Sequence, residues 1–249
     1  MEEPMVSVIM PAYNCEKYIG MAIESVLAQS VSFELIIIED RSLDGTLKVI
    51  KKYTDDNRII LIENEKNMGV ALSRNRGVEN ASGKYVAFLD SDDYWTKDKL
   101  SKQVALMEEK KAVLSSTGRQ LIDDNGELIN RYIGITEKIT YKDLLRGNVI
   151  NTSGVMILTE VIKRFPMTQE KLLEDYIVWL KVLKETDCAY GIDEPLLNYR
   201  LMKGSKSGNK LKSARMTFGV YRYMGYNVIQ SCYYFICYAI NGILKYKIK

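Results

Sequence analysis

Three carboxylates lie close together in the segment YVAFLDSDDYW, at residues 85–95. Asp90, Asp92 and Asp93 follow an apolar run, Tyr85–Leu89, that is typical of a buried strand. Neighbouring carboxylates repel one another, and losing their hydration costs free energy. A hard cation such as Mg²⁺ or Mn²⁺ removes that cost, because it prefers oxygen ligands and often bridges protein carboxylates to substrate phosphates. The spacing therefore predicts a metal site, and the alternative is a turn in which an aspartate caps the following helix.

Composition limits the chemistry that can accompany these carboxylates. The chain has 249 residues, enough for one large domain or a domain with an appendage, and it contains no histidine. This excludes a Ser-His-Asp triad, a Cys-His pair and the usual zinc sites. Any acid–base step must therefore rest on carboxylates or other groups.

The cysteines and the first residues indicate a cytoplasmic protein. Cys15, Cys188, Cys232 and Cys237 show neither CxxC spacing nor a dense disulfide pattern, which suits a reducing compartment. The N-terminal segment has acidic residues where a secretory signal would be basic, so we expect no such signal.

Strand and helix patterns alternate over the first hundred residues, which is typical of βαβ units and a parallel sheet. The expected strands are Val6–Ala12, Glu34–Ile38, Arg58–Ile62 and Tyr85–Leu89, and the expected helices are Asn14–Gln29, Thr46–Tyr53, Val70–Asn80 and Lys97–Glu109. Polar clusters follow three of these strands, at Pro11–Asn14, Glu39–Asp44 and Asp90–Asp93. Since ligands bind beyond the carboxyl ends of parallel strands, the three clusters predict one site.

The pattern is looser after Lys110. We expect one long helix there, Leu172–Glu185. The expected strands are Val113–Ser116, Gln120–Ile122, Gly154–Leu158, Ala189–Ile192 and Leu196–Leu201.

Four segments in order, SVIMPAYNCEKYI, IIIEDRSLDGT, NMGVALSRNRG and FLDSDD, resemble the inverting glycosyltransferases of family 2. The resemblance covers Ser7–Trp95 with family-like spacing and continues more loosely to Ser207. It implies an α/β protein with the GT-A fold, in which helices flank a mostly parallel central sheet. Residues 1–208 would form this domain, with a nucleotide-binding half (1–110) and an acceptor-binding half (111–208). Residues 209–249 would add amphipathic helices.

The resemblance assigns the donor-binding residues. Pro11, Ala12, Tyr13 and Asn14 would hold the uridine, although Asn14 also fits an N-cap of the next helix. Asp40 would accept the uracil N–H, and Asp44 fits nucleotide contact and a turn equally well. Arg74 would lie near the diphosphate, whose oxygens suit a guanidinium group.

The same resemblance assigns the carboxylates and the base. Asp90, Ser91 and Asp92 form a DxD motif beside Asp93, and they would hold Mn²⁺ or Mg²⁺ on the diphosphate, with the ligating carboxylates left open. Glu174 and Asp175 match the family's ED motif. Asp175 would be the single base that an inverting displacement needs, and the alternative is that both acids only complement a helix N-terminus.

A basic loop follows the last expected strand. Many relatives carry a histidine where this chain has Met202, so the imidazole is missing here. Lys203, Lys206 and the hydroxyls of Ser205 and Ser207 remain as expected contacts to the substrate phosphates, and Arg200 is expected among the substrate-binding residues.

The C-terminal tail is basic and rich in tyrosine. No acidic residue follows Glu194, whereas ten basic residues do, and Tyr223–Leu244 is uncharged. Its four polar residues make a spanning helix unfavourable, and its tyrosines prefer interfaces. We therefore expect helices at the inner surface of the cell membrane, with packing on the domain as the alternative. Nucleic-acid binding is disfavoured, because the aromatic residues accompany long apolar runs and few charges.

Together these features predict metal-dependent transfer of a hexosyl unit, glucose or galactose, from a UDP-sugar to a saccharide acceptor. Similar bacterial enzymes extend sugars on undecaprenyl diphosphate during O-antigen, lipopolysaccharide or capsule synthesis, which implies a lipid-linked acceptor. One alternative is a sugar nucleotidyltransferase, although Pro11–Asn14 is not the glycine-rich loop that such an enzyme needs. The other is a UDP-sugar-binding membrane scaffold without turnover.

Overall fold

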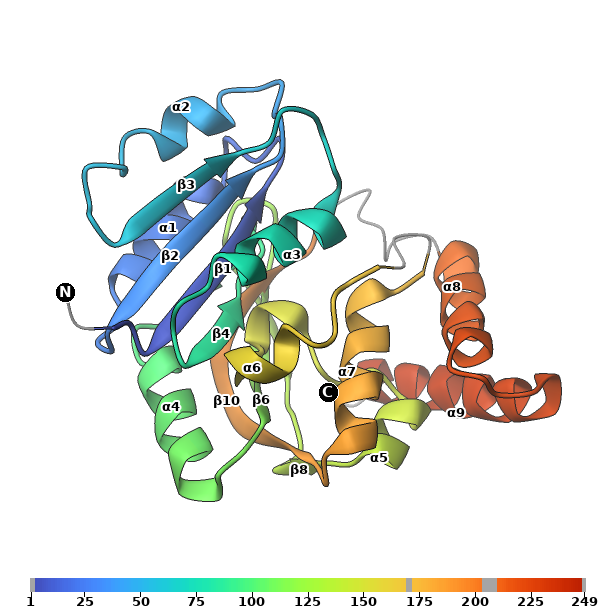
Figure 1. Ribbon diagram of the computed structural model, residues 1–249. Coiled ribbons are helices and arrows are strands. Elements are labelled where there is room, and N and C mark those ends of the chain that lie inside the picture. The colour runs from blue at the N-terminus through green and yellow to red at the C-terminus, as the bar shows by residue number, and fades with distance from the viewer. Residues whose placement is uncertain (1–2, 169–171, 203–209, 248–249) are drawn as a thin grey trace.

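A central sheet with helices on both faces organises the protein in a computed structural model that describes residues 3–168, 172–202 and 210–247 (Figure 1). The strands are β1 (Val6–Ala12), β2 (Phe33–Glu39), β3 (Ile59–Glu63), β4 (Tyr85–Phe88), β5 (Tyr94–Trp95), β6 (Leu114–Ile122), β7 (Leu128–Ile133), β8 (Lys138–Ile139), β9 (Met156–Leu158) and β10 (Ala189–Arg200). The helices are α1 (Ile19–Leu27), α2 (Thr46–Ile50), α3 (Val70–Glu79), α4 (Lys99–Lys110), α5 (Tyr141–Arg146), the short 3₁₀ helix η1 (Thr152–Gly154), α6 (Thr159–Ile162), α7 (Glu174–Glu185), α8 (Lys210–Tyr223) and α9 (Val228–Lys247). The expected α/β class is confirmed.

The sheet is parallel in its first half and mixed in its second. Its order is β3-β2-β1-β4-β9-β6-β10-β5, and the neighbours from β3 to β4 are all parallel. Strand β9 runs antiparallel to both β4 and β6, and β6 pairs with β10 in parallel. The carboxyl ends of β1, β2 and β4 therefore lie at one edge, as the polar clusters predicted.

Alternating side chains bury both faces of the sheet. Ile9 and Ile36 belong to one core cluster, on the side of α3 and α7, whereas Val8 and Leu35 belong to the other, on the side of α1 and α4. Helix α3 approaches closely at Gly77, where a Cβ atom would come within 2.4 Å of Ile9 Cγ2. The β-branched runs thus form strands covered on both faces, as expected for parallel sheets.

Two long strands replace the shorter ones expected in the second half. Strand β6 continues through Gly118, and β10 continues through Pro195 with register shifts on either side of that proline. Proline has no backbone N–H to donate, so a local irregularity accommodates it without ending the strand. The sequence signals at these positions indicated breaks, and that interpretation was wrong.

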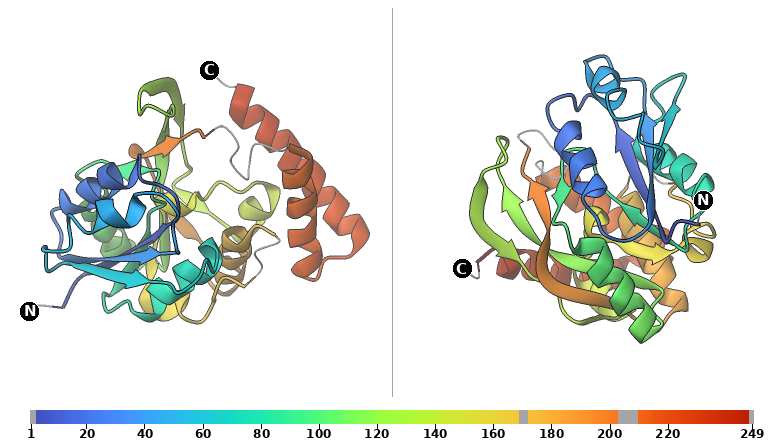
Figure 2. Two further views of the ribbon diagram at one scale, coloured as in Figure 1. Left: turned by 90° about the horizontal axis from the view of Figure 1, so that it is seen from above. Right: turned by 90° about the vertical axis from the view of Figure 1, so that its left-hand side faces the viewer.

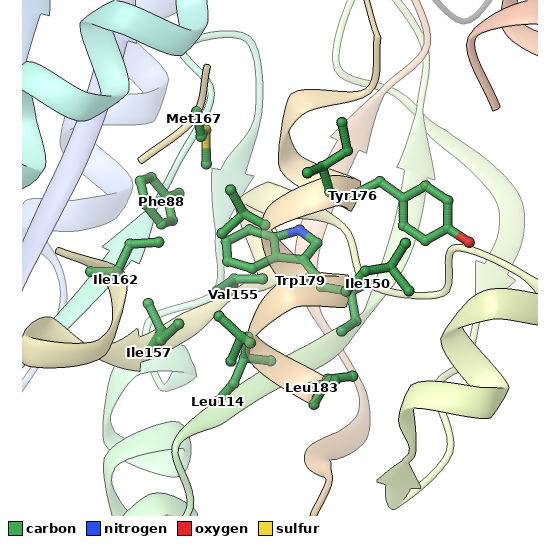
Figure 3. Packing of buried hydrophobic residues seen from close by; sticks show 14 of the residues in the cluster. Phe88, Leu114, Ile150, Val155, Ile157, Ile162, Met167, Tyr176, Trp179 and Leu183 are labelled. Carbon is green, nitrogen blue, oxygen red and sulfur yellow. The ribbon is translucent and has the colours of Figure 1, made fainter. Parts of the chain in front are cut away.

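Helix α7 is held against the sheet by a hydrophobic cluster around Trp179 (Figure 3). The ring centroid of Trp179 lies 6.0 Å from that of Phe88 on β4, and Leu114 and Ile157 belong to the same cluster. Since Trp179 is one turn beyond Asp175, this packing fixes the N-terminal end of α7.

The C-terminal tail is helical and packs on the domain, as the views in Figures 1 and 2 show. The Tyr221 hydroxyl donates to Leu145 O at 2.8 Å, and Asn241 Nδ2 donates to Arg146 O at 3.0 Å. Both contacts are to α5, so the packing alternative holds for this face of the tail.

The outward face of α9 is apolar. Four large apolar side chains of α9 are exposed and recur at helical spacing: Ile229 (82% exposed), Tyr233 (54%), Ile236 (57%) and Ile240 (52%). Over the described residues, we find no helix whose length and apolarity would let it cross a membrane.

Candidate functional site

A cavity of about 740 Å³ lies at the carboxyl edge of the parallel strands, with walls from both halves of the chain. Its lining includes most of the residues singled out in the sequence: Pro11, Ala12, Tyr13, Asn14, Asp40, Arg74, Asp90, Ser91, Asp92, Glu174 and Asp175. The four sequence motifs and the ED motif therefore meet in one place.

The loop after β1 is fixed by its neighbour after β2. Asn14 has a φ of 48°, and its side-chain oxygen accepts from Leu43 N at 2.8 Å. Because that oxygen is engaged and α1 begins at Ile19 after the N-cap residue Tyr18, the capping alternative for Asn14 was wrong. Tyr13 remains 45% exposed in the cavity lining, which leaves its ring accessible to a nucleobase.

Asp40 holds the loop that precedes α3. Its carboxylate accepts from Asn64 Nδ2 at 2.7 Å and from the backbone N–H groups of Met68 and Gly69, both at 2.8 Å. Gly69 has a φ of 85°, a conformation that favours glycine. A carboxylate offers about four acceptor positions, so Asp40 retains capacity for one further donor. Contact with a uracil N–H stays a prediction.

Asp44 does not line the cavity. It accepts from the backbone N–H and the hydroxyl of Thr46, at 3.0 and 2.6 Å, and from Glu16 N at 3.2 Å. The turn interpretation of Asp44 is therefore the one that the structure supports, and we remove it from the nucleotide contacts.

Of the three carboxylates after β4, two line the cavity and one is buried away from it. Asp90 and Asp92 line the cavity, whereas Asp93 is 2% exposed and accepts from Arg200 N at 2.9 Å. Burial and the Asp90 charge raise the pKa of Asp92 to about 6. Burial and both neighbouring carboxylates raise the pKa of Asp93 well above its usual value. Asp93 was expected among the metal ligands; it is absent from the cavity lining and one of its oxygens accepts from Arg200 N, so its ligation of a metal stays a prediction.

Asp90 and Asp92 fit a divalent cation. A positive charge would relieve the repulsion that raises the pKa of Asp92. In the described part of the chain, no three His, Cys, Asp or Glu side chains are grouped as a metal site. Diphosphate oxygens and water would therefore complete the shell, as is common for Mg²⁺.

Arg74 connects the two halves of the site. Its Nη2 atom lies 2.5 Å from Asp90 Oδ1, and its Nη1 atom lies 3.7 Å from Glu174 Oε1. Burial opposes the charge of Arg74, but Asp90, Asp175 and Glu174 together raise its pKa. Its Nε atom is buried and has no hydrogen-bond partner among the described residues, although the residue itself lines the cavity.

Asp175 is oriented by two hydrogen bonds at the start of α7. The hydroxyl of Thr152 donates to Asp175 Oδ2, and Tyr176 N donates to Oδ1, both at 2.7 Å. The Asp175 carboxylate therefore complements the helix N-terminus and also lines the cavity. This geometry is compatible with a role as the base, which stays a prediction. Such a positioned carboxylate is suited to accept a proton from a bound hydroxyl.

Arg200 does not line the cavity. Its Nε atom donates to Asp92 O at 2.8 Å, its Nη1 atom donates to Asp123 O and Asp124 O at 2.8 and 3.1 Å, and its guanidinium lies 4.6 Å from the ring centroid of Tyr18. Backbone carbonyls occupy the guanidinium group, so Arg200 holds the carboxylate loop, and its expected contact with substrate stays a prediction. The expected contacts Lys203, Ser205, Lys206 and Ser207 lie outside the described residues.

Several lining residues carried no sequence signal. They come from β6, the segment after α5, the end of β10 and the tail: Arg119, Asn148, Asn151, Thr152, Tyr199, Met216 and Tyr238. Met202, where many relatives have a histidine, also lines the cavity. Residues 148–153 contain four polar side chains among six, but the segment matches no motif.

Comparison with known proteins agrees with this geometry. The family model for glycosyl transferase family 2 matches residues 7–164. The chain is 40% identical over 246 residues, 98% of both chains, to TuaG of Bacillus subtilis (strain 168), named as a teichuronic acid biosynthesis glycosyltransferase. It is 34% identical over 255 residues, 99% of this chain and 96% of the relative, to WfgD of Escherichia coli, a UDP-Glc:α-D-GlcNAc-diphosphoundecaprenol β-1,3-glucosyltransferase.

Solved structures share the fold. S. aureus TarS in complex with UDP matches with a TM-score of 0.69 at 22% identity, over 86% of this chain and 64% of that chain. The mannosyltransferase PcManGT from Pyrobaculum calidifontis, in complex with GDP-Man and Mn²⁺, matches with a TM-score of 0.69 at 16% identity, over 90% of this chain and 65% of that chain. This chain therefore spans about two thirds of each solved chain, and the expected GT-A fold is confirmed.

Proposed function

Because the chain belongs to glycosyl transferase family 2, we propose that it transfers a hexosyl unit from a UDP-sugar to a saccharide acceptor with inversion at the anomeric carbon. One observation carries the proposal: Asp175 and the Asp90–Asp92 carboxylates line the same cavity, joined through Arg74. A single base opposite a metal-bound leaving group is the arrangement that one inverting displacement needs.

The donor occupies the first half of the cavity. The uridine lies against Tyr13 and near Asp40, and the diphosphate lies beside the Arg74–Asp90 ion pair and Asp92. Asp90 and Asp92 would hold Mn²⁺ or Mg²⁺, and the bound ion would supply positive charge for the departing UDP. The UDP complex of TarS and the Mn²⁺ complex of PcManGT support this placement by shared fold.

Asp175 accepts the proton of the acceptor hydroxyl. As that oxygen forms its bond to the anomeric carbon, the bond between this carbon and the diphosphate breaks and UDP leaves with the electron pair. Thr152 keeps Asp175 Oδ2 in place during the transfer. Arg74 neutralises Asp90 and Glu174 and faces the charge that develops on the diphosphate.

The named E. coli relative supports glucose as the donor sugar and a lipid-diphosphate-linked saccharide as the acceptor, and galactose remains the second candidate donor. The product belongs to a bacterial surface polysaccharide, such as O-antigen or capsule. We place the enzyme at the inner surface of the cell membrane, peripherally bound, because the apolar outward face of α9 and the tail's basic residues suit a surface of anionic lipid.

The test is transfer from UDP-glucose and UDP-galactose to a GlcNAc-diphosphoryl-alkyl acceptor, with Mn²⁺, Mg²⁺ or chelator. We expect turnover that chelator abolishes. Asp175→Asn should lower turnover by roughly 10²–10⁴-fold, the range for loss of a general base, while UDP affinity is unchanged.

Two outcomes would favour the alternatives. A scaffold would bind UDP-sugar without turnover and would respond to Asp175→Asn in no assay. A sugar nucleotidyltransferase would join UTP to a sugar 1-phosphate, forming a UDP-sugar and releasing diphosphate.

A further inference from the structure

We propose that the acceptor saccharide is bound between the side-chain amides of Asn148 and Asn151 and the ring of Tyr238, so that the C-terminal helix forms one wall of the acceptor subsite. All three residues line the cavity. The proposal rests on the transfer reaction proposed above, and it adds the residues that recognise the acceptor.

The two amides have unused hydrogen-bonding capacity. The Oδ1 atoms of Asn148 and Asn151 are buried, and neither has a hydrogen-bond partner among the described residues. A buried acceptor without a partner is unfavourable, and buried polar groups in proteins are usually satisfied. Both oxygens are closed off from solvent, so a ligand in the cavity reaches them only after the carboxamide turns about its last side-chain torsion angle. A carboxamide turned in this way pairs its oxygen with one hydroxyl of a pyranose and its NH₂ group with the next.

The amides lie beside the base. Asn151 immediately precedes Thr152, whose hydroxyl donates to Asp175 Oδ2 at 2.7 Å. The segment that orients the base therefore also carries the unpaired amide. Asn151 and Asp175 line the same cavity, so a sugar bound at Asn151 shares that cavity with the carboxylate that accepts the proton, and holding the acceptor there favours attack.

Tyr238 closes the same region from α9. Its ring centroid lies 6.2 Å from that of Tyr176, the residue after Asp175. One turn further along α9, Asn241 donates to Arg146 O, and its Cβ lies 3.7 Å from where a Cβ on Gly147 would be. These contacts place Tyr238 between the start of α7 and the Asn148 segment.

The chemistry of this group is that of a saccharide site. Sites for small polar ligands combine aromatic walls with a few fixed polar groups, and here an aromatic ring, two amides and a carboxylate line one cavity. The donor residues come from residues 11–92, whereas these come from the second half and the tail. Because the donor is assigned to residues 11–92, we assign the lining residues of the second half and the tail to the acceptor.

The orientation of α9 suits an acceptor on a lipid. At 100° per residue, Tyr238 lies on the opposite side of the helix from the exposed Ile229. One helix thus presents an aromatic side chain to the cavity and an apolar face to the outside.

The experiment compares Asn148→Ala, Asn151→Ala and Tyr238→Ala with the parent protein, using UDP-glucose and a GlcNAc-diphosphoryl-alkyl acceptor. Each variant should raise the acceptor KM by about 10-fold, as the loss of one good hydrogen bond or contact implies. The donor KM, and hydrolysis of UDP-glucose without acceptor, should stay unchanged.

Three variants control for general effects. Asn57→Ala removes an exposed amide far from the cavity, and Tyr233→Ala removes an exposed tyrosine on the other face of α9. Tyr238→Phe retains the ring and should retain the acceptor KM, so it separates the contact from folding of α9. An unchanged acceptor KM in Asn148→Ala, Asn151→Ala and Tyr238→Ala would overturn the proposal.

Direct binding separates this proposal from the proposed function. Calorimetric titration of the UDP-loaded protein with the same acceptor needs no turnover. Binding that the three substitutions weaken, without transfer by any donor, would retain the subsite and reject the reaction. Transfer by the parent protein, together with equal acceptor binding in all variants, would retain the reaction and reject the subsite.

Discussion

Nη2 of Arg74 lies 2.5 Å from Oδ1 of Asp90, and this ion pair joins α3 to the segment that follows β4. The same guanidinium reaches Glu174 at the start of α7, 3.7 Å away. The pairing gives Arg74 two roles: it neutralises carboxylates from both halves of the chain, and it lines the cavity where we place the diphosphate.

Arg74→Met should destabilise the protein and reduce transfer. Removing one partner of a buried ion pair leaves uncompensated charge and costs about 3–5 kcal/mol. Arg58→Met is the matched control, because the Arg58–Asp56 pair is partly exposed and such pairs contribute about 0–1 kcal/mol. Urea unfolding of both variants measures the difference. Equal losses would show that Arg74 does not neutralise the site.

Thr152→Val should reduce kcat while leaving donor affinity intact. The substitution keeps the side-chain shape and removes the hydrogen bond that orients Asp175. We expect a decrease in kcat of about 10-fold, since a misplaced base loses part of its contribution. Thr152→Ser retains the hydroxyl and should retain kcat. Identical rates for the valine and serine variants would exclude this positioning role.

Asp92→Asn and Asp93→Asn should separate the two carboxylates in their effect on metal. Asp92 lines the cavity and Asp93 faces Arg200 N. The affinity for UDP, measured at increasing Mn²⁺ concentration, should therefore no longer depend on the metal in Asp92→Asn and should still depend on it in Asp93→Asn. The opposite result would identify Asp93 as the ligand.

Lys99 should make the stability of the protein depend on alkaline pH. The side chain is fully buried, its Nζ donates to Gln103 Oε1 at 2.6 Å, and burial lowers the pKa of Lys99 well below its usual value. In the unfolded chain this amine titrates near its usual pKa of about 10.4. The unfolded state therefore binds more protons between the lowered pKa and that value, so the free energy of unfolding rises with pH across this window.

Lys99→Met should remove this rise. Urea unfolding at several pH values between neutrality and pH 10 measures it, with Lys97→Met, which removes an exposed lysine just before the same helix, as the control. Parallel pH profiles for Lys99→Met and the parent protein would contradict the burial argument.

Glutamate at Ile236 and Ile240 should weaken membrane binding. Both side chains are more than half exposed on the outward face of α9, and a charge there opposes insertion between headgroups. Co-sedimentation with phosphatidylglycerol-rich vesicles should fall, while transfer to a short-chain acceptor is retained. Leu128→Glu is the control, since Leu128 is exposed on β7, away from the tail. Unchanged sedimentation would place the membrane contact elsewhere.

The first half of the fold was predictable because its signals are local. Strand and helix patterns up to Trp95 lie in one continuous series of βα units, and each motif ends a strand or opens a helix, so Asp40, Arg74 and Asp90 could be placed without knowing the rest of the chain. The second half depends on contacts between distant segments. Thr152 and Tyr238 enter the cavity through the packing of α7, α5 and α9, and no local pattern encodes that.

Arg200 and Asp93 show a different limit. Residue type indicates a charge available for substrate, but it does not reveal which partners use it. The donors of Arg200 are occupied by carbonyl groups of Asp92, Asp123 and Asp124. The inward turn of Asp93 depends on the backbone N–H of Arg200, 107 positions later in the chain.

The cavity lining supplied by Met216 and Tyr238 bears on how the protein can be engineered. A shortened chain ending before α8 would keep all four motifs and the ED acids, but its cavity would be open on one side. Trimming the tail to improve solubility should therefore cost acceptor recognition. Polar replacements at Ile229 and Ile236 alter only the outward face, and they offer a soluble enzyme whose cavity stays closed.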